Sequence, residues 1–261
     1  MEKINQKIAY LKTNGYELQF ENVFNKAFEN YKKIALYAGL AILVFGFIFM
    51  VLAAIGLISF VGVEHLNENT IKQLESKMLQ PEYIGYQFIG VLIVSCLFSP
   101  ISAGFLKMAE AGNKDVEYKI SEFFYYYKWL YFKELMLATF IITAVNTGIS
   151  SLLTYYKIPF LGGVLSFIIG LFTVFTIPLI LFGKQKAIAA ISSSLHLSSK
   201  QVFVIFLLIF VAFIGSLVGL LGFCIGMLFT IPFNISMQYA IYETVIGSKE
   251  DEVVVLESEE N

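Results

Sequence analysis

The side chains that could do chemistry in this sequence are uncharged and lie within long apolar stretches. They are amides and hydroxyls that could bond across helices: Asn146, Thr147, Thr176, Thr230, Asn234 and Gln238. In lipid, such hydrogen bonds contribute about 0.6–2 kcal/mol each. The two asparagines are the costliest to leave unpaired, so the pattern predicts interhelical contacts. A polar vestibule that admits a substrate is the alternative.

Ionisable side chains are absent from the cores of these apolar stretches. A charged residue there is the usual indication of an ion path, a proton relay or a catalytic site, so its absence argues against a coupled transporter. The two histidines, His65 and His196, fall on opposite membrane faces in the topology given below and cannot share a metal site. No nucleotide-binding loop or hydrolase motif occurs. We therefore expect no enzyme, no catalytic residue, no metal site and no cofactor.

Lysine supplies all 18 basic residues of the sequence. Arginine is the preferred clamp for phosphate, and its absence argues against binding to nucleic acid. The segment 183–201 combines Lys184, Lys186 and Lys200 with five serines and no acidic residue. These three lysines are candidate contacts for anionic lipid headgroups, each contributing about 1 kcal/mol. Setting the membrane topology is the simpler role for them.

An aromatic cluster fills residues 123–132, where eight of ten side chains are Phe, Tyr or Trp. Aromatic rings concentrate where lipid headgroups meet the hydrocarbon. The cluster therefore predicts an anchor at the membrane interface, and a shelf for a lipid-like ligand is the alternative.

The composition indicates that these residues sit in a membrane. The 261 residues are 57% hydrophobic and 15% charged, whereas soluble domains are about 45–50% apolar and about 25% charged. A span needs about 20 apolar residues. Candidate spans are 34–60, 84–106, 135–155, 160–182, 202–221 and 224–246. The sequence thus predicts an all-α integral membrane fold of six transmembrane helices, arranged as three helical hairpins.

The distribution of lysines predicts the orientation. Fifteen lysines fall on one side of the predicted spans and three on the other, and the lysine-rich side of a membrane protein is cytoplasmic. Three regions follow: a cytoplasmic amphipathic segment 1–33, a six-span domain 34–247 and an acidic cytoplasmic tail 248–261. The first two regions together carry a net charge of +3 and the tail carries −5. The tail could bind a protein partner, although a plain solubilising role is the simpler reading.

Three parts of the chain look alike. Phe175-Thr176-Ile177-Pro178 recurs as Phe229-Thr230-Ile231-Pro232, and Phe98-Ser99-Pro100 is a looser copy. We expect helix kinks at Pro100, Pro178 and Pro232, where a nearby hydroxyl can bond the freed carbonyl. Amphipathic interfacial helices are expected before the first, third and fifth spans, near residues 20–31, 120–131 and 188–200.

Glycine spacing predicts how the last two spans meet. Gly215 and Gly219, and then Gly222 and Gly226, lie four residues apart. Small residues at this spacing permit close helix approach. We expect a tight hairpin with its turn near residues 219–223.

The closing part of the chain resembles a known family. The residues concerned are Ala187–Ile191 with Ser194 and Leu195, then Gly226–Pro232 and Tyr239–Glu243. They resemble the bacterial six-helix membrane family that includes the YciC-type proteins and the membrane domain of some glycerophosphodiester phosphodiesterases. The resemblance implies a helical fold in the inner membrane and supplies no catalytic residues.

Together these features predict a non-enzymatic, multi-pass protein of the inner (plasma) membrane. It would act through membrane lipids or a protein partner in the envelope. The alternative is a channel or transporter for a neutral or amphipathic solute, which would use the kinked helices and the buried amides and hydroxyls.

The topology can be tested with reporter fusions. We expect a reporter fused after Ser248 to behave as internal and one inserted near Asn67 to behave as external, because the lysine asymmetry fixes both termini in the cytoplasm. Alkaline phosphatase and fluorescent-protein activities measure the two positions. The opposite pattern would overturn the orientation.

Overall fold

The computed structural model describes residues 2–62, 72, 76, 80–222 and 225–247, and all secondary structure in these residues is helical. In chain order the helices are α1 (Glu2–Asn14), α2 (Phe20–Val61), α4 (Pro81–Asn113), η2 (Ile120–Tyr127), α5 (Trp129–Tyr155), α6 (Pro159–Phe172), α7 (Thr176–Leu181), α8 (Ala187–Lys200), α9 (Val202–Val218), η3 (Gly219–Gly222), α10 (Ile225–Thr230) and α11 (Pro232–Ile246). His65 and the acidic tail 248–261 lie outside the described residues.

Four helical segments are long and apolar enough to cross a membrane: Phe20–Ser59, Glu82–Asn113, Trp129–Tyr155 and Pro159–Leu181. They cover the first four predicted spans except for the last residue of the first span and of the fourth. No residue of the most apolar stretch of α2 is buried against the rest of the protein. Apolar surface on this scale is not left in water by soluble proteins, so the helices indicate a membrane-spanning protein.

The region of the fifth and sixth predicted spans is more broken. Helices α8 and α9 are bent by 99° at their junction, and the pair can be counted as a fifth span. Within the predicted span 224–246, the described residues form the six-residue α10 and the 15-residue α11, and most of α11 is buried inside the protein. A count of six spans in three hairpins therefore stays a prediction.

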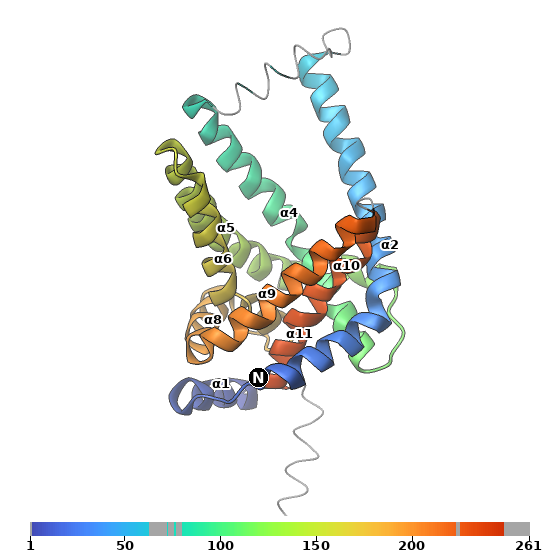
Figure 1. Ribbon diagram of the computed structural model, residues 1–261, viewed down its shortest axis with the longest axis vertical. Helices are drawn as coiled ribbons and strands as arrows, with labels where there is room; N and C mark the ends of the chain where they lie inside the picture. The colour runs from blue at the N-terminus through green and yellow to red at the C-terminus, as the bar shows by residue number, and fades with distance from the viewer. Residues whose placement is uncertain (1, 63–71, 73–75, 77–79, 223–224, 248–261) are drawn as a thin grey trace, which may run out of the picture.

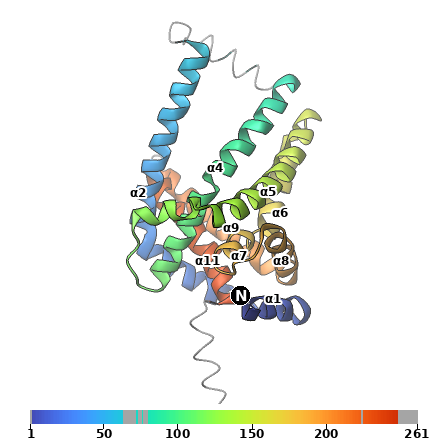
Figure 2. The ribbon, with the colours of Figure 1, turned by 180° about the vertical axis from the view of Figure 1, so that it is seen from behind.

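The helices diverge from a common base. The C-terminal half of α2, the N-terminal half of α4 and the α5–α6 pair rise as separate arms (Figure 1). Helix α11 packs against α2, α4 and α9 in the centre. The opposite view shows α7 and α8 low in the molecule and α1 lying across its lower end (Figure 2). We call this end, which carries α1, α8 and the C-terminal end of α11, the base.

Small side chains make the close contacts at the base. The buried face of α2 repeats every three or four residues, at Val23, Ala27, Asn30, Ile34 and Ala38. In α8 the buried residues are mostly alanines and serines, together with Leu197, while Ile188 and Leu195 remain 68% and 44% exposed. The amphipathic helix expected near residues 188–200 thus turns two of its larger apolar side chains outward, as an interfacial helix would toward lipid.

Pro100, Pro178 and Pro232 each leave one backbone carbonyl without its helical hydrogen bond. The surroundings of these three carbonyls differ. Proline removes the N–H that would bond the carbonyl four residues earlier. At Pro100, inside the continuous helix α4, the Ser99 hydroxyl donates to the Cys96 carbonyl at 2.9 Å. At Pro178 the freed Val174 carbonyl accepts a bond of 2.8 Å from Gln238 Nε2.

The third freed carbonyl packs against a neighbouring helix. Pro232 is the first residue of α11 and frees the Leu228 carbonyl. A Cβ added at Gly39 of α2 would lie 3.0 Å from this oxygen and 2.6 Å from the Phe229 ring. The absence of a side chain at Gly39 therefore allows α10 to approach α2. The chain is interrupted before Pro178 and at Pro232, as the motif predicts, whereas α4 continues through Pro100.

The 3₁₀-helix η3 (Gly219–Gly222) follows α9, where the glycine spacing predicts a turn near residues 219–223. A Cβ on Gly226 would collide with the backbone oxygen of Gly219, and a Cβ on Gly219 would lie 2.5 Å from the Met227 nitrogen. The close approach of α9 and α10 therefore requires glycine at both positions.

Gly226→Ala should destabilise the protein by about 1–3 kcal/mol, because backbone atoms cannot move aside cheaply. Thermal unfolding of the purified protein in mild detergent measures the effect. The matched control is Gly46→Ala in α2, where an added Cβ meets no atom within 4 Å; alanine's higher helix propensity predicts equal or greater stability there. Equal destabilisation by both substitutions would contradict the contact.

Candidate functional site: a lysine–tyrosine pocket at the base

A pocket of about 520 Å³ opens at the base, where the ends of α4, α7 and α11 meet η2 and the start of α5. Its polar lining consists mainly of lysine, glutamate and tyrosine side chains. We call it the lysine–tyrosine pocket, and its charged and phenolic residues are Lys107, Glu110, Lys114, Glu122, Tyr125, Tyr126, Tyr131, Lys184, Tyr239, Tyr242 and Glu243.

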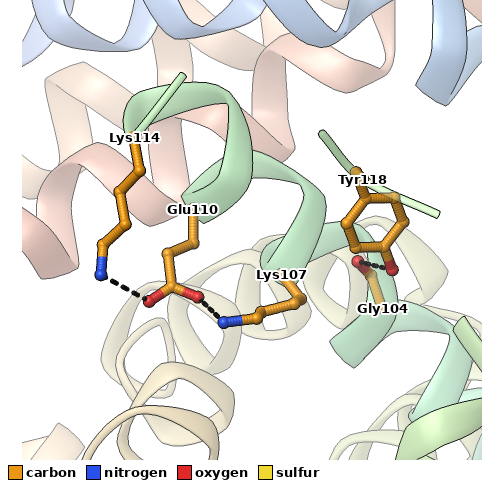
Figure 3. A network of polar contacts seen from close by, with 5 residues as sticks. All are labelled: Gly104, Lys107, Glu110, Lys114 and Tyr118. Atoms are coloured by element: carbon orange, nitrogen blue, oxygen red, sulfur yellow. Dashed lines mark hydrogen bonds and ion pairs between the residues drawn. The ribbon is translucent and has the colours of Figure 1, made fainter. Parts of the chain in front are cut away.

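Glu110 organises the charges along α4. Its side chain is 12% exposed and forms ion pairs with Lys107, three residues earlier, and with Lys114, four residues later, at 3.5 Å (Figure 3). These spacings place all three side chains on one face of the helix. One carboxylate therefore holds two lysines at the pocket.

The other carboxylates of the pocket have different partners. Glu243 pairs with Lys26 of α2 at 3.3 Å and accepts a hydrogen bond from Asn113 at 3.5 Å. Glu122 accepts a hydrogen bond of 3.5 Å from the backbone N–H of Lys119. Lys184 is exposed and has no ion-pair partner within the described part of the chain. The pocket thus has three ammonium groups and three carboxylates, but Glu243 pairs with a lysine outside the pocket and Lys184 has no ion-pair partner among the described residues.

Three tyrosines form one wall of the pocket. The rings of Tyr125, Tyr126 and Tyr131 lie 5.4–5.6 Å apart between centroids. Burial raises the pKa of Tyr126, and the Glu110 carboxylate adds to the shift. Its phenol therefore stays protonated at neutral pH and can donate a hydrogen bond.

The connection from α4 to η2 is fixed by aromatic packing. The Tyr118 hydroxyl donates to the Gly104 carbonyl at 2.9 Å (Figure 3). The Phe123 ring is buried against Gly104, where a side chain would collide with it. Phe123 also packs edge-on against Phe105 and Phe45. The predicted interfacial helix near residues 120–131 is thus a 3₁₀-helix, η2, that closes over α4, and α5 begins at Trp129.

Lys184 reaches the pocket because the chain breaks between α6 and α7. The Phe172 carbonyl accepts hydrogen bonds from Ser194 at 2.8 Å and Ser198 at 3.3 Å, and the Phe175 N–H donates to the Ser194 hydroxyl at 3.1 Å. Two buried serines of α8 therefore satisfy the backbone groups of the break. The chain after α7 turns back with Lys184 at a positive φ of 51°.

Glu134 fixes the start of α8. Its carboxylate accepts a hydrogen bond of 2.8 Å from the Ala187 N–H, the first of the helix. A carboxylate at a helix N-terminus also interacts favourably with the helix dipole. Helix α8, which carries the serines of the break, is thereby tied to α5.

The structure separates the three lysines predicted to contact lipid. All three are exposed, but only Lys184 lines the lysine–tyrosine pocket, where it joins Lys107 and Lys114. Lys186 precedes α8 and Lys200 ends it. A 14-residue helix is about 21 Å long, so Lys200 is far from Lys186 and the pocket.

The predicted polar residues within the spans fall into several groups. Thr230 and Asn234 bond across to α9: the Thr230 hydroxyl donates to the Ser216 carbonyl at 2.7 Å, and Asn234 Nδ2 donates to the Ser216 hydroxyl. Both are contacts between helices, and Gln238 Nε2 donates to the Val174 carbonyl. Thr176 is different, because its buried hydroxyl has no hydrogen-bond partner in the described residues.

The asparagine predicted in α5 does not make such a contact. Asn146 Oδ1 is buried without a hydrogen-bond partner, and the Thr147 side chain makes no hydrogen bond within the described ranges. The nearby contact between α5 and α6 is made by Ser150 and Ser166, whose hydroxyls lie 3.1 Å apart.

Sequence reasoning missed the most buried amide. Asn30 is 3% exposed, and its Nδ2 donates to the Ala109 carbonyl at 2.6 Å while Oδ1 accepts from the Ser236 hydroxyl at 2.9 Å. It joins α2, α4 and α11. The sequence could have indicated this role, because Asn30 lies on the same helical face as Val23, Ala27 and Ile34, and a polar residue on a buried apolar face needs hydrogen-bond partners.

A second cavity, of about 500 Å³, lies between α5–α6 and α9–α11. We call it the central cavity. Asn234 and Gln238 line it, but Asn146 does not. The remaining lining is Thr139, Ile142, Thr143, Ser166, Phe167, Gly170, Leu171, Thr173, Val174, Ile177, Ile209, Ala212 and Met237.

The two asparagines give a matched test of which amide matters. Asn30→Leu should lower the free energy of unfolding by about 2–3 kcal/mol, because it leaves a buried carbonyl and hydroxyl unpaired. Asn146→Leu should leave stability unchanged or higher, because it removes an unpaired buried oxygen. Unfolding midpoints in one detergent compare them, and a larger loss for Asn146→Leu would refute this ranking.

Comparisons with other proteins add no assignment to this geometry. Among the described residues, no three His, Cys, Asp or Glu side chains group closely enough to hold a metal ion. His196 Nδ1 lies 2.7 Å from the Ser192 carbonyl within α8. No protein-family model, curated protein or solved structure matches the chain.

Proposed function

We propose that the chain is a non-enzymatic inner-membrane (plasma membrane) protein that holds the phosphate of an anionic phospholipid headgroup in the lysine–tyrosine pocket. The observation that carries this proposal is the unpaired ammonium group of Lys184. The pocket is lined by three lysines and three glutamates, but Lys107 and Lys114 both pair with Glu110, and Lys184 has no ion-pair partner in the described part of the chain. A lipid phosphate would supply a negative charge for Lys184.

The position of the pocket supports a headgroup as its occupant. Lys107 lies at the end of the apolar stretch of α4, and the exposed Trp129 begins α5 beside η2. Lysine and tryptophan near helix ends are typical of the membrane interface. A phosphate at this level would reach the lysines while its acyl chains stay beside the exposed apolar arms.

The orientation follows from the same lysines. The base carries the N-terminal helix and most of the lysines, so the positive-inside rule assigns it to the cytoplasmic leaflet. In the proposed six-span arrangement, α9 with η3 forms the fifth span and α10 with α11 the sixth. Each run has about the length that a span requires. The acidic tail would then extend from the base, where it could contact a protein partner.

A channel or transporter for a neutral solute is the second candidate, and the central cavity favours it. Asn234 lines that cavity but is bonded to Ser216, and Asn146 is not among the lining residues. A continuous polar path through both asparagines is therefore not supported, and we rank this function second.

Lys184→Gln should weaken the binding of phosphatidylglycerol about fivefold, the equivalent of about 1 kcal/mol per lysine. Native mass spectrometry of the full chain in mild detergent measures the affinity of each lipid. Phosphatidylcholine should bind more weakly to the wild type and should respond less to the substitution.

Lys200→Gln is the matched control, because Lys200 is also exposed but does not line the pocket. Its phosphatidylglycerol affinity should equal that of the wild type. Equal losses of phosphatidylglycerol affinity in both variants would show that the lysines act only as general surface charge. If the wild type bound phosphatidylglycerol no more tightly than phosphatidylcholine, the proposal would be overturned.

A further inference from the structure

The central cavity differs in chemistry from the lysine–tyrosine pocket. Among the described residues no charged side chain lines it, and its walls combine apolar residues such as Phe167, Ile209 and Met237 with amides and hydroxyls. Transferring an ion into such surroundings is costly without a partner. The cavity therefore suits a neutral ligand, and its volume of about 500 Å³ lies within the usual range of ligand sites.

Two amides on α11 face this cavity one helical turn apart, and their orientations are fixed. Gln238 bonds the Val174 carbonyl at 2.8 Å. A carbonyl can only accept, so the group that faces Val174 must be Nε2. The oxygen Oε1 therefore remains as an acceptor.

The same reasoning applies to Asn234. It bonds the Ser216 hydroxyl, which is 3.0 Å from the Ala212 carbonyl and 3.2 Å from the Thr230 carbonyl. Because Ser216 donates its single proton to one of these carbonyls, it must accept from Asn234 Nδ2. No hydrogen bond from the described residues reaches Asn234 Oδ1 or Gln238 Oε1.

We infer that the central cavity binds a neutral lipid that carries a hydroxyl group, such as a fatty alcohol or an acylglycerol. The hydroxyl would donate to Asn234 Oδ1 or Gln238 Oε1, and the chain would lie against Phe167 and Ile209. This site is separate from the proposed headgroup pocket, uses no lysine and stands if that proposal fails.

Gly170 provides a way to block the cavity. It lies on the face of α6 that lines the cavity, between Ser166 and Val174, and a Cβ added there meets no atom within 4 Å. Gly170→Leu would fill the space without a backbone collision, and leucine favours the helix over glycine. Gly163→Leu is the matched control, because it has the same open surroundings on α6 but does not line the cavity.

The probe is a dodecanol that carries a photoreactive diazirine, used on the full chain in nanodiscs. We expect saturable labelling that maps to α6, α9 or α11. Dodecanol should compete roughly tenfold better than dodecyl methyl ether, which has the same chain but cannot donate a hydrogen bond. Labelling should be lost in Gly170→Leu and retained in Gly163→Leu.

Two results would overturn the inference: equal competition by the ether, which would show that no donor is recognised, or unchanged labelling of Gly170→Leu. The comparison of alcohol and ether is made on the wild type and does not depend on a variant folding. Lys184→Gln should leave labelling unchanged, which separates this site from the lysine–tyrosine pocket.

Discussion

The structure depends on one constraint, which is that a backbone polar group without a helical partner must be satisfied inside a protein that sits in lipid. Hydrocarbon offers no hydrogen bonds, yet the chain breaks its helices beside Pro178 and Pro232. At the first break, Ser194 and Gln238 supply the missing partners from two other helices. At the second break, Gly39 of α2 lies against the freed Leu228 carbonyl, and the Thr230 hydroxyl donates to the Ser216 carbonyl of α9. The breaks thus determine which helices must lie together.

The same breaks create the two pockets. Because α7 is short and the chain turns back after it, Lys184 and Phe182 come to face α11 at the base. The gap that α6 leaves beside α9 and α11 becomes the central cavity. Helix α11 contributes to both sites: its polar C-terminal end bears Glu243, and one turn of its N-terminal half bears Asn234 and Gln238. A single helix therefore separates a charged site from a neutral one.

Because charged side chains line one pocket and uncharged polar side chains line the other, one small protein has the chemistry for two different ligands. Lysines at the base can neutralise a phosphate where water and headgroups lower the cost of charge. The uncharged amides of the central cavity can orient a hydroxyl, and no ion has to be buried there. The fixed amide orientations at Gln238 and Asn234 come from bonds that also hold the broken helices together, so the structure and the proposed binding depend on the same contacts.

The sequence by itself determined the helical class, the first four apolar spans, the breaks near two prolines and the tight glycine turn, because each depends on local periodicity or on residue type. It also indicated that Thr230, Asn234 and Gln238 need hydrogen-bond partners, and left open whether they join helices or line a cavity. It did not reveal Asn30, the serines of α8, or the meeting of Lys184 with Lys107 and Lys114. Asn146 and Asn30 are the same side chain in similar helical surroundings, and only the positions of neighbouring helices decide that Asn30 finds two partners while Asn146 Oδ1 finds none. Residues far apart in the chain meet only through packing, which local patterns do not specify.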